Sequence, residues 1–180
     1  MSEIIIQSKY KYKLILSENY LCVPYTLKMV IDAAIGNEIS VEKIISFFRI
    51  IRPSDTEDIN QYGAIIKNGD INALFNSLSI PLREEYIPIN TISEDSFAEI
   101  IIEQMSKGNH LIFGYSYGYL YDEEEYLKLG HVSIISEINS DTIKLLNPGP
   151  NNAGSAQFST DKIYTAIRMK KDGLWVIKPI

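Results

Sequence analysis

The sequence predicts an α+β fold in which N-terminal helices pack on a C-terminal antiparallel sheet. In the first half, apolar residues recur at helical spacing and each run has a start or stop signal. From residue 110 onward, short segments rich in Ile, Val, Tyr and Phe are separated by glycines, which is typical of strands and turns. This order, with helices first and strands afterwards, differs from the alternation of strands and helices that is typical of a parallel sheet. The 180 residues are 46% apolar and 22% charged, which predicts one domain over residues 1–180.

The first elements predicted are a strand at residues 11–16 and a helix that begins at Cys22. Pro24 fits the first helical turn because the N–H groups there have no intrahelical partner. Gly36 is a natural C-terminal stop for this helix. Its apolar stripe consists of Tyr25, Met29, Val30 and Ala33. Cys22 is therefore expected at the N-terminal end of a buried helix.

Three more helices are predicted before residue 110. The first runs from Ser40, whose hydroxyl can cap it, to about Ile50. The second follows Asp70, a possible cap, and the third begins at Ser93 and ends at Gly108. The expected core-facing residues are Ile71, Leu74, Phe75 and Leu78 on the second helix and Phe97, Ile100, Ile101 and Met105 on the third.

The second half is predicted to contain five strands, with residues 171–173 as a hairpin turn between the last two. In the first of these strands four tyrosines alternate, so they should share one face and serve either in packing or as a wall of a substrate groove. The tyrosines are Tyr115, Tyr117, Tyr119 and Tyr121. The strands are expected at residues 111–119, 131–138, 142–147, 164–170 and 174–177.

Charge and composition exclude several classes of protein. A net charge of -6 with scattered basic residues argues against a nucleic-acid partner, and no apolar run approaches the length of a membrane span. One cysteine and two histidines cannot form an intramolecular disulfide or a Cys-rich zinc cluster, and no metal or organic cofactor is implied. The first seven residues lack the features of a signal peptide, so a cytoplasmic protein is expected.

Three residues form the candidate site: Cys22 at a helix start, His131 at a strand start and Asn147 at the end of the next strand. These two strands should pair as a hairpin around residues 138–140. With a three-residue loop, His131 lies directly opposite Asn147 on the same face of the sheet. The two side chains are then within reach of each other.

This arrangement suits nucleophilic catalysis by a thiol. A helix N-terminus and an adjacent imidazolium can lower the pKa of a cysteine, so Cys22 is predicted to be an acidic nucleophile. His131 would take and return the proton, and the Asn147 oxygen would orient the imidazole. The non-catalytic alternatives are that Cys22 is an inert apolar residue and that Asn147 only marks a turn. His110, expected as a surface imidazole beside a helix end, is the alternative base.

The sequences CVPYTLKMV at 22–30, GHVSII at 130–135 and LLNPG at 145–149 resemble those of papain-like cysteine peptidases. The resemblance is to the bacteriocin-leader-processing, C39-like peptidases and their stand-alone relatives, and it covers nearly the whole chain. It implies a papain-like fold, Cys22 as nucleophile, His131 as general base and Asn147 as the orienting residue. A thioester acyl-enzyme formed with a peptide or amide substrate would follow.

The chain departs from the pattern of this family at two positions. Val23 stands where a glycine is usual, and Leu16 stands where the family has a glutamine that helps to form the oxyanion hole. Asn19 or, less plausibly, Ser17 could supply the missing donor. These departures leave two alternatives open: a catalytically silent binding module that keeps the cleft, and a papain-like acyltransferase of a biosynthetic pathway. The sequence does not predict the oligomeric state.

Overall fold

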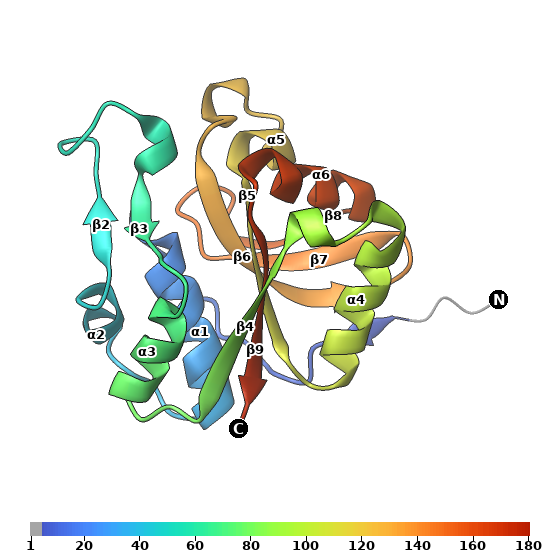
Figure 1. Ribbon diagram of the computed structural model, residues 1–180, viewed down its shortest axis with the longest axis horizontal. Helices are drawn as coiled ribbons and strands as arrows, with labels where there is room; N and C mark the ends of the chain where they lie inside the picture. The colour runs from blue at the N-terminus through green and yellow to red at the C-terminus, as the bar shows by residue number, and fades with distance from the viewer. Residues whose placement is uncertain (1–4) are drawn as a thin grey trace.

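The computed structural model describes residues 5–180 and is built around one antiparallel sheet (Figure 1). The strand order is β4-β9-β5-β6-β7-β8, and β1 pairs with the far end of β6. Two further short strands, β2 and β3, form a separate antiparallel pair. The strands are β1 (Ile6–Gln7), β2 (Arg49–Ile51), β3 (Gly63–Ile65), β4 (Leu82–Pro88), β5 (His110–Ser116), β6 (Gly130–Ile138), β7 (Thr142–Asn147), β8 (Gly154–Ser159) and β9 (Gly173–Pro179).

Helices cover both faces of this sheet. In Figure 1, α1, α2 and α3 lie on one side with the β2–β3 pair, and α4, α5 and α6 lie on the other. None of the helices in residues 5–180 has the length and apolar character needed to cross a bilayer. The helices are α1 (Cys22–Ile35), α2 (Val41–Ile45), α3 (Asp70–Ser77), α4 (Glu94–Ser106), α5 (Tyr117–Tyr121) and α6 (Thr160–Lys170), and the 3₁₀ turns are η1 (Ile59–Gln61), η2 (Ile89–Thr91) and η3 (Glu124–Tyr126).

Alternation along the central strands divides the core into two layers. On β9, Leu174 and Val176 pack with α4 and α6, whereas Trp175 and Ile177 pack with α1 and α3. Strand β5 divides in the same way and is buried along its whole length. The mixed α+β fold with an antiparallel sheet, predicted from the sequence, is confirmed.

The helices predicted at Cys22, Asp70 and Ser93 are confirmed, although their caps differ in detail. Helix α1 begins at Cys22 without a side-chain cap and ends at Gly36, whose φ of 71° favours glycine. Ser93 caps α4 by accepting a hydrogen bond from the N–H of Ser96. Gly69, rather than Asp70, is the N-cap residue of α3.

Two predictions in the N-terminal half are wrong. Residues 11–16 are not a strand, since no neighbouring strand pairs with them among the described residues, and Leu16 is 64% exposed. The helix expected from Ser40 to Ile50 ends at Ile45, and β2 follows it. Pairing with β3 overrides the helical pattern there, and the Ser40 hydroxyl bonds Glu42 instead of capping a backbone N–H.

Two strands predicted in the C-terminal half are helical in part or in full. Strand β5 ends at Ser116, which caps α5 by accepting a hydrogen bond from the N–H of Tyr119, so the four tyrosines do not share a strand face. Residues 164–170 belong to α6, which begins after the capping residue Ser159. Its buried residues Ile163, Tyr164 and Ile167 have helical spacing, and residues 171–173 therefore join a helix to β9 rather than two strands.

The sequence did not predict β4 or β8. Both are edge strands with mixed polar and apolar residues, and their side chains are only partly buried. The consecutive charges of β4 at residues 83–85 hide its alternation. β4 is a strand because it pairs along its whole length with β9, which lies about 90 positions later in the chain.

The predicted register of the β6–β7 hairpin is also wrong, by two residues, at the end of the hairpin that holds His131 and Asn147. Ile134 pairs with Leu146, so the position opposite Asn147 is Ser133 rather than His131. The pairing shifts by one residue between Ile135 and Glu137. A shift of two residues keeps His131 and Asn147 on the same face of the sheet, as diagonal neighbours.

Candidate active site

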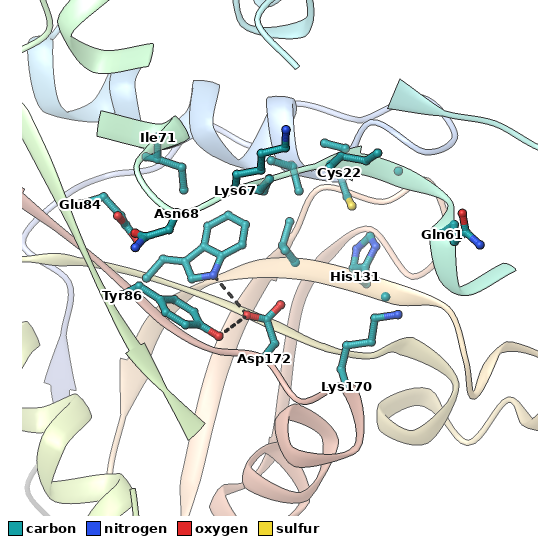
Figure 2. Close-up of a pocket in the computed structure, with 18 of the residues that line it drawn as sticks. Cys22, Gln61, Lys67, Asn68, Ile71, Glu84, Tyr86, His131, Lys170 and Asp172 are labelled. Carbon is teal, nitrogen blue, oxygen red and sulfur yellow. Dashed lines mark hydrogen bonds between the residues drawn. The ribbon is translucent and has the colours of Figure 1, made fainter. Parts of the chain in front are cut away.

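A cavity of about 960 Å³ opens beside the N-terminus of α1 (Figure 2). One wall is the segment from η1 to the start of α3, and the other is formed by β4, β6, β9 and the end of α6. Cys22 and His131 both line it. Asn147 lies behind His131 and is fully buried.

His131 and Asn147 are joined by a short hydrogen bond. The Nε2 atom of His131 lies 2.7 Å from Oδ1 of Asn147. His131 is the second residue of β6 and Asn147 is the last residue of β7, so the contact joins two neighbouring strands. The structure thus brings together two of the three residues predicted from the sequence, through the diagonal contact rather than direct pairing.

The surroundings of Asn147 fix the orientation of its amide. Its Oδ1 also accepts the backbone N–H of Gly149 at 2.8 Å. Its Nδ2 donates to the carbonyl oxygens of Asn151 and Asn152, at 3.1 and 2.9 Å, and to the hydroxyl of Tyr121 at 3.0 Å. Because carbonyl oxygens can only accept and a backbone N–H can only donate, the amide cannot be flipped. Asn147 therefore presents an acceptor to His131.

This acceptor sets the tautomer of the imidazole. The Nε2 atom of His131 must carry the hydrogen that Oδ1 of Asn147 accepts, and in a neutral ring Nδ1 is then the acceptor. Burial lowers the pKa of His131 to about 4, and the hydrogen bond to Asn147 opposes this shift. His131 is thus neutral at physiological pH, with the lone pair of Nδ1 free to take a proton.

Tyrosine rings hold the His131 imidazole from two sides. Tyr115 and Tyr117 meet it edge to face, with ring centroids at 5.6 and 5.4 Å. The Tyr115 hydroxyl is tied to that of Ser133 at 2.9 Å, and the Tyr117 hydroxyl accepts a hydrogen bond from Asn152 at 2.6 Å. Three of the four tyrosines noted in the sequence, Tyr121 included, therefore support His131 and Asn147.

The thiol of Cys22 points from the first turn of α1 toward the His131 ring (Figure 2). Burial raises the pKa of Cys22 to about 11, although backbone N–H groups of Val132, Val23 and Cys22 itself oppose this rise. The sequence predicted a lowered pKa for the Cys22 thiol, and this prediction is wrong for this state of the protein. Thiol and imidazole are thus both neutral, and Figure 2 shows the sulfur directed toward the ring.

The two candidate oxyanion donors differ in availability. The hydroxyl of Ser17 donates to the carbonyl of Gly149 at 2.7 Å, so its one hydrogen is engaged. Asn19 is exposed in the turn before α1, and its side chain makes no hydrogen bond within the described residues. The side chain of Leu16 cannot donate. Asn19 and the backbone N–H at the start of α1 remain as candidates.

His110 is not the surface imidazole that the sequence suggested. It is fully buried at the start of β5, where its ring stacks on Tyr10 with centroids 3.7 Å apart. Its Nδ1 bonds the Tyr12 hydroxyl at 2.9 Å. Burial lowers the pKa of His110 to about 3. His110 does not line the cavity, so it is excluded as the alternative base.

Sequence reasoning missed four polar residues of the cavity: Glu84, Tyr86, Lys170 and Asp172. Glu84 and Tyr86 lie on the unpredicted strand β4, and Lys170 and Asp172 flank the junction of α6 and β9. The only local signal is Asp172-Gly173, which predicts a turn. Their convergence depends on the pairing of β4 with β9.

Comparison with solved structures identifies the fold as that of the C39-like peptidases, as the resemblance in the sequence predicted. The chain is similar to a protein from Bacillus anthracis described as a C39-like peptidase, with a TM-score of 0.61 and 12% identity over 99% of this chain and 98% of that one. It is similar to the peptidase domain of Streptococcus ComA, a bifunctional ABC transporter involved in quorum sensing, with a TM-score of 0.61 and 14% identity over 94% and 100% of the two chains. No protein-family model and no curated protein sequence matches the chain.

Proposed function

We propose that this protein is a thiol-dependent peptidase or amidohydrolase that acts through Cys22, His131 and Asn147. The observation that carries the proposal is the His131 imidazole, which Asn147 holds in the Nε2–H tautomer at 2.7 Å while the Cys22 thiol faces the ring. The peptidase-like fold supports it. The substrate is a peptide or amide that enters the cavity.

The reaction begins when the Cys22 sulfur attacks the carbonyl carbon as Nδ1 of His131 removes the thiol proton. Breaking of the C–N bond releases an amine that takes this proton, and a thioester remains on Cys22. Water, deprotonated by the same nitrogen, then hydrolyses the thioester to an acid and the free thiol. Asn147 keeps the Nε2–H bond through both steps and stabilises the imidazolium that forms.

Because the thiol and the imidazole are both neutral, the thiol proton moves to the imidazole during attack on the substrate rather than before the substrate binds. A buried thiol with a raised pKa reacts slowly with small alkylating agents, so iodoacetamide reports poorly on this site. An epoxysuccinyl peptide is a better probe because it occupies the cavity and its ring opens only on attack by sulfur. We expect one adduct at Cys22, seen by mass spectrometry of the intact protein and its digest.

The matched comparison uses wild type, Cys22→Ala and His131→Ala. The proposal requires that the adduct disappear in the first variant and form far more slowly in the second. Labelling of Cys22 at the same rate in His131→Ala, or at the rate of a free-cysteine peptide, would contradict it. Circular dichroism of each variant separates loss of reactivity from loss of fold.

A catalytically silent binding module is the second candidate, favoured by the incomplete oxyanion hole. Leu16 is exposed and Ser17 is engaged with Gly149, so one donor of the usual pair is left to Asn19. Loss of one oxyanion donor costs about 10²- to 10³-fold in rate. Incubation with activated acyl esters distinguishes the candidates, because an enzyme accumulates a thioester on Cys22 and a silent module does not. Product analysis with added amines separates hydrolysis from acyl transfer.

A further inference from the structure

The cavity extends from Cys22 and His131 to the carboxylate of Asp172, between α6 and β9 (Figure 2). Its Oδ1 accepts the backbone N–H of Gly173 at 2.8 Å, the Tyr86 hydroxyl at 3.2 Å and the Trp175 indole N–H at 3.4 Å. These donors come from the paired strands β4 and β9. They fix the carboxylate in one orientation.

The second oxygen, Oδ2, receives no hydrogen bond from any residue in the range 5–180, and Figure 2 shows it directed into the cavity on the side of His131. It lies over Gly114 of β5, where an added Cβ would come within 1.9 Å of it. Gly114 does not have a positive φ, so the glycine is required here for close approach and not for a turn. The sheet therefore leaves space for this carboxylate.

No cation of the described chain neutralises Asp172. The nearest candidate is Lys170, whose Nζ donates to the carbonyls of Lys128 and Asn60, at 3.1 and 3.4 Å, and makes no ion pair with Asp172. Burial raises the pKa of Asp172 although its three donors and Lys170 oppose that shift. A partly desolvated carboxylate that forms no ion pair favours the binding of a cation.

We propose that Asp172 forms a subsite for a cationic group of the substrate, an ammonium or guanidinium near the bond that Cys22 attacks. The cation would bond Oδ2, and its aliphatic stem would lie on the aromatic wall of Tyr86 and Trp175. Glu84, also in the lining, adds negative charge at this end. Lys67 and Lys170 balance the total charge of the lining, and Figure 2 shows the Lys67 ammonium directed away from Asp172, so the preference belongs to the Asp172 end alone.

The test measures binding in a Cys22→Ala background, so that it does not depend on catalysis. Trp175 is the only tryptophan of the chain, and its indole bonds Asp172, so its fluorescence reports on this end of the cavity. The probes are acetyl-Ala-Ala-Lys-Ala-Ala-amide, the same peptide with norleucine or glutamate in place of lysine, and an unacetylated alanine pentapeptide amide. Isothermal titration gives the affinities independently of any change in quantum yield.

We expect the lysine peptide to bind about tenfold or more tightly than the norleucine peptide, because a hydrogen bond to a charged group is worth more than a neutral one. Asp172→Asn, which keeps the Oδ1 acceptor, should reduce this preference to less than about twofold. Glu85→Gln is the matched control, since Glu85 lies on the same strand β4 but is exposed and paired with Lys178. It should leave the preference unchanged.

Any of the following results would overturn the proposal: equal affinity for the lysine and norleucine peptides, tighter binding of the glutamate peptide, a lysine preference that persists in Asp172→Asn, or one that is lost only in Glu84→Gln. Absence of binding by every peptide at about 10 mM would also overturn it. Tighter binding of the unacetylated peptide than of the acetylated lysine peptide would identify the cation as the substrate's terminal amine. If Asp172→Asn does not fold, the lysine–norleucine comparison and its loss at high salt decide the question.

The proposal rests on the proposed function only in calling the ligand a substrate. A lysine preference without epoxysuccinyl labelling of Cys22 would support the subsite and contradict the enzyme. Labelling of Cys22 without a lysine preference would support the enzyme and contradict the subsite.

Discussion

The two histidines of the chain are both buried and both neutral, yet only one is placed to act on a substrate. Burial lowers the pKa of His131 to about 4 and that of His110 to about 3. His131 has Nε2 satisfied by Asn147 and lines the cavity, whereas His110 has Nδ1 bonded to Tyr12 and Nε2 buried without a partner among residues 5–180. Burial alone thus keeps an imidazole neutral. Which nitrogen is bonded, and what the other one faces, decides whether it can serve as a base.

The largest expected effect is that of His131→Ala on labelling of Cys22 by an epoxysuccinyl peptide. Removal of a general base costs about 10²- to 10⁴-fold, so the second-order rate constant should fall by that range. His110→Phe keeps the stack on Tyr10 and should leave this rate within about twofold. A comparable loss of labelling in both variants would show that the two histidines do not differ in function.

Asn147→Ala should have the next largest effect because it removes the acceptor that fixes the imidazole tautomer. We expect labelling to slow by about 10- to 100-fold, since misplacement of a catalytic group by about 1 Å is sufficient for such a loss. The rate constant over a series of probe concentrations separates this loss from weaker binding of the probe. An unchanged rate constant in a folded Asn147→Ala protein would refute the orienting role.

The two histidines should also make the protein sensitive to acid. Each has a lower pKa in the folded state than its usual 6.5, so the unfolded chain binds more protons below that pH, and stability falls as pH decreases toward 4. Between about pH 6 and 5 each contributes a slope of about 1 kcal/mol per pH unit. Urea unfolding from pH 7 to 4.5 should show a shallower decline in His110→Phe than in wild type. Parallel declines would mean that His110 is not neutral by burial.

The smallest effect is expected for Tyr121→Phe. The Tyr121 hydroxyl is one of three acceptors around Nδ2 of Asn147, and the carbonyls of Asn151 and Asn152 remain after its loss. Labelling of Cys22 should therefore slow by no more than about threefold. A loss as large as that of Asn147→Ala would show that the tyrosine, and not the two carbonyls, holds the amide in place.

The sequence predicted that the candidate site residues lie together, but not their exact geometry. Cys22, His131 and Asn147 could be placed near one another because a helix start and the ends of two adjacent strands are local features. The expected register missed the shift between Ile135 and Glu137, and the contact survived because strand faces repeat every two residues. The charge state of Cys22 could not be predicted, since burial by distant segments sets it.

The elements that the sequence predicted wrongly depend either on a local helix cap or on tertiary contacts. Apolar residues at 164–170 fit a strand or a helix equally well until the cap at Ser159 is recognised. The alternation of tyrosines after residue 115 is broken by the cap at Ser116. Asp172 reaches the cavity only because β4 pairs with β9, and no local pattern in the sequence indicates that pairing.

Two hydrogen bonds of Ser17 have a consequence for the motions of this protein. Its N–H donates to the carbonyl of Pro148 at 2.8 Å and its hydroxyl to that of Gly149, so the segment that leads to Cys22 is bonded to the turn that follows Asn147. Opening at either place must break the same two bonds. Amide hydrogen exchange of Ser17, whose N–H is the donor in one of these bonds, should consequently report on the opening of both segments as a single cooperative unit.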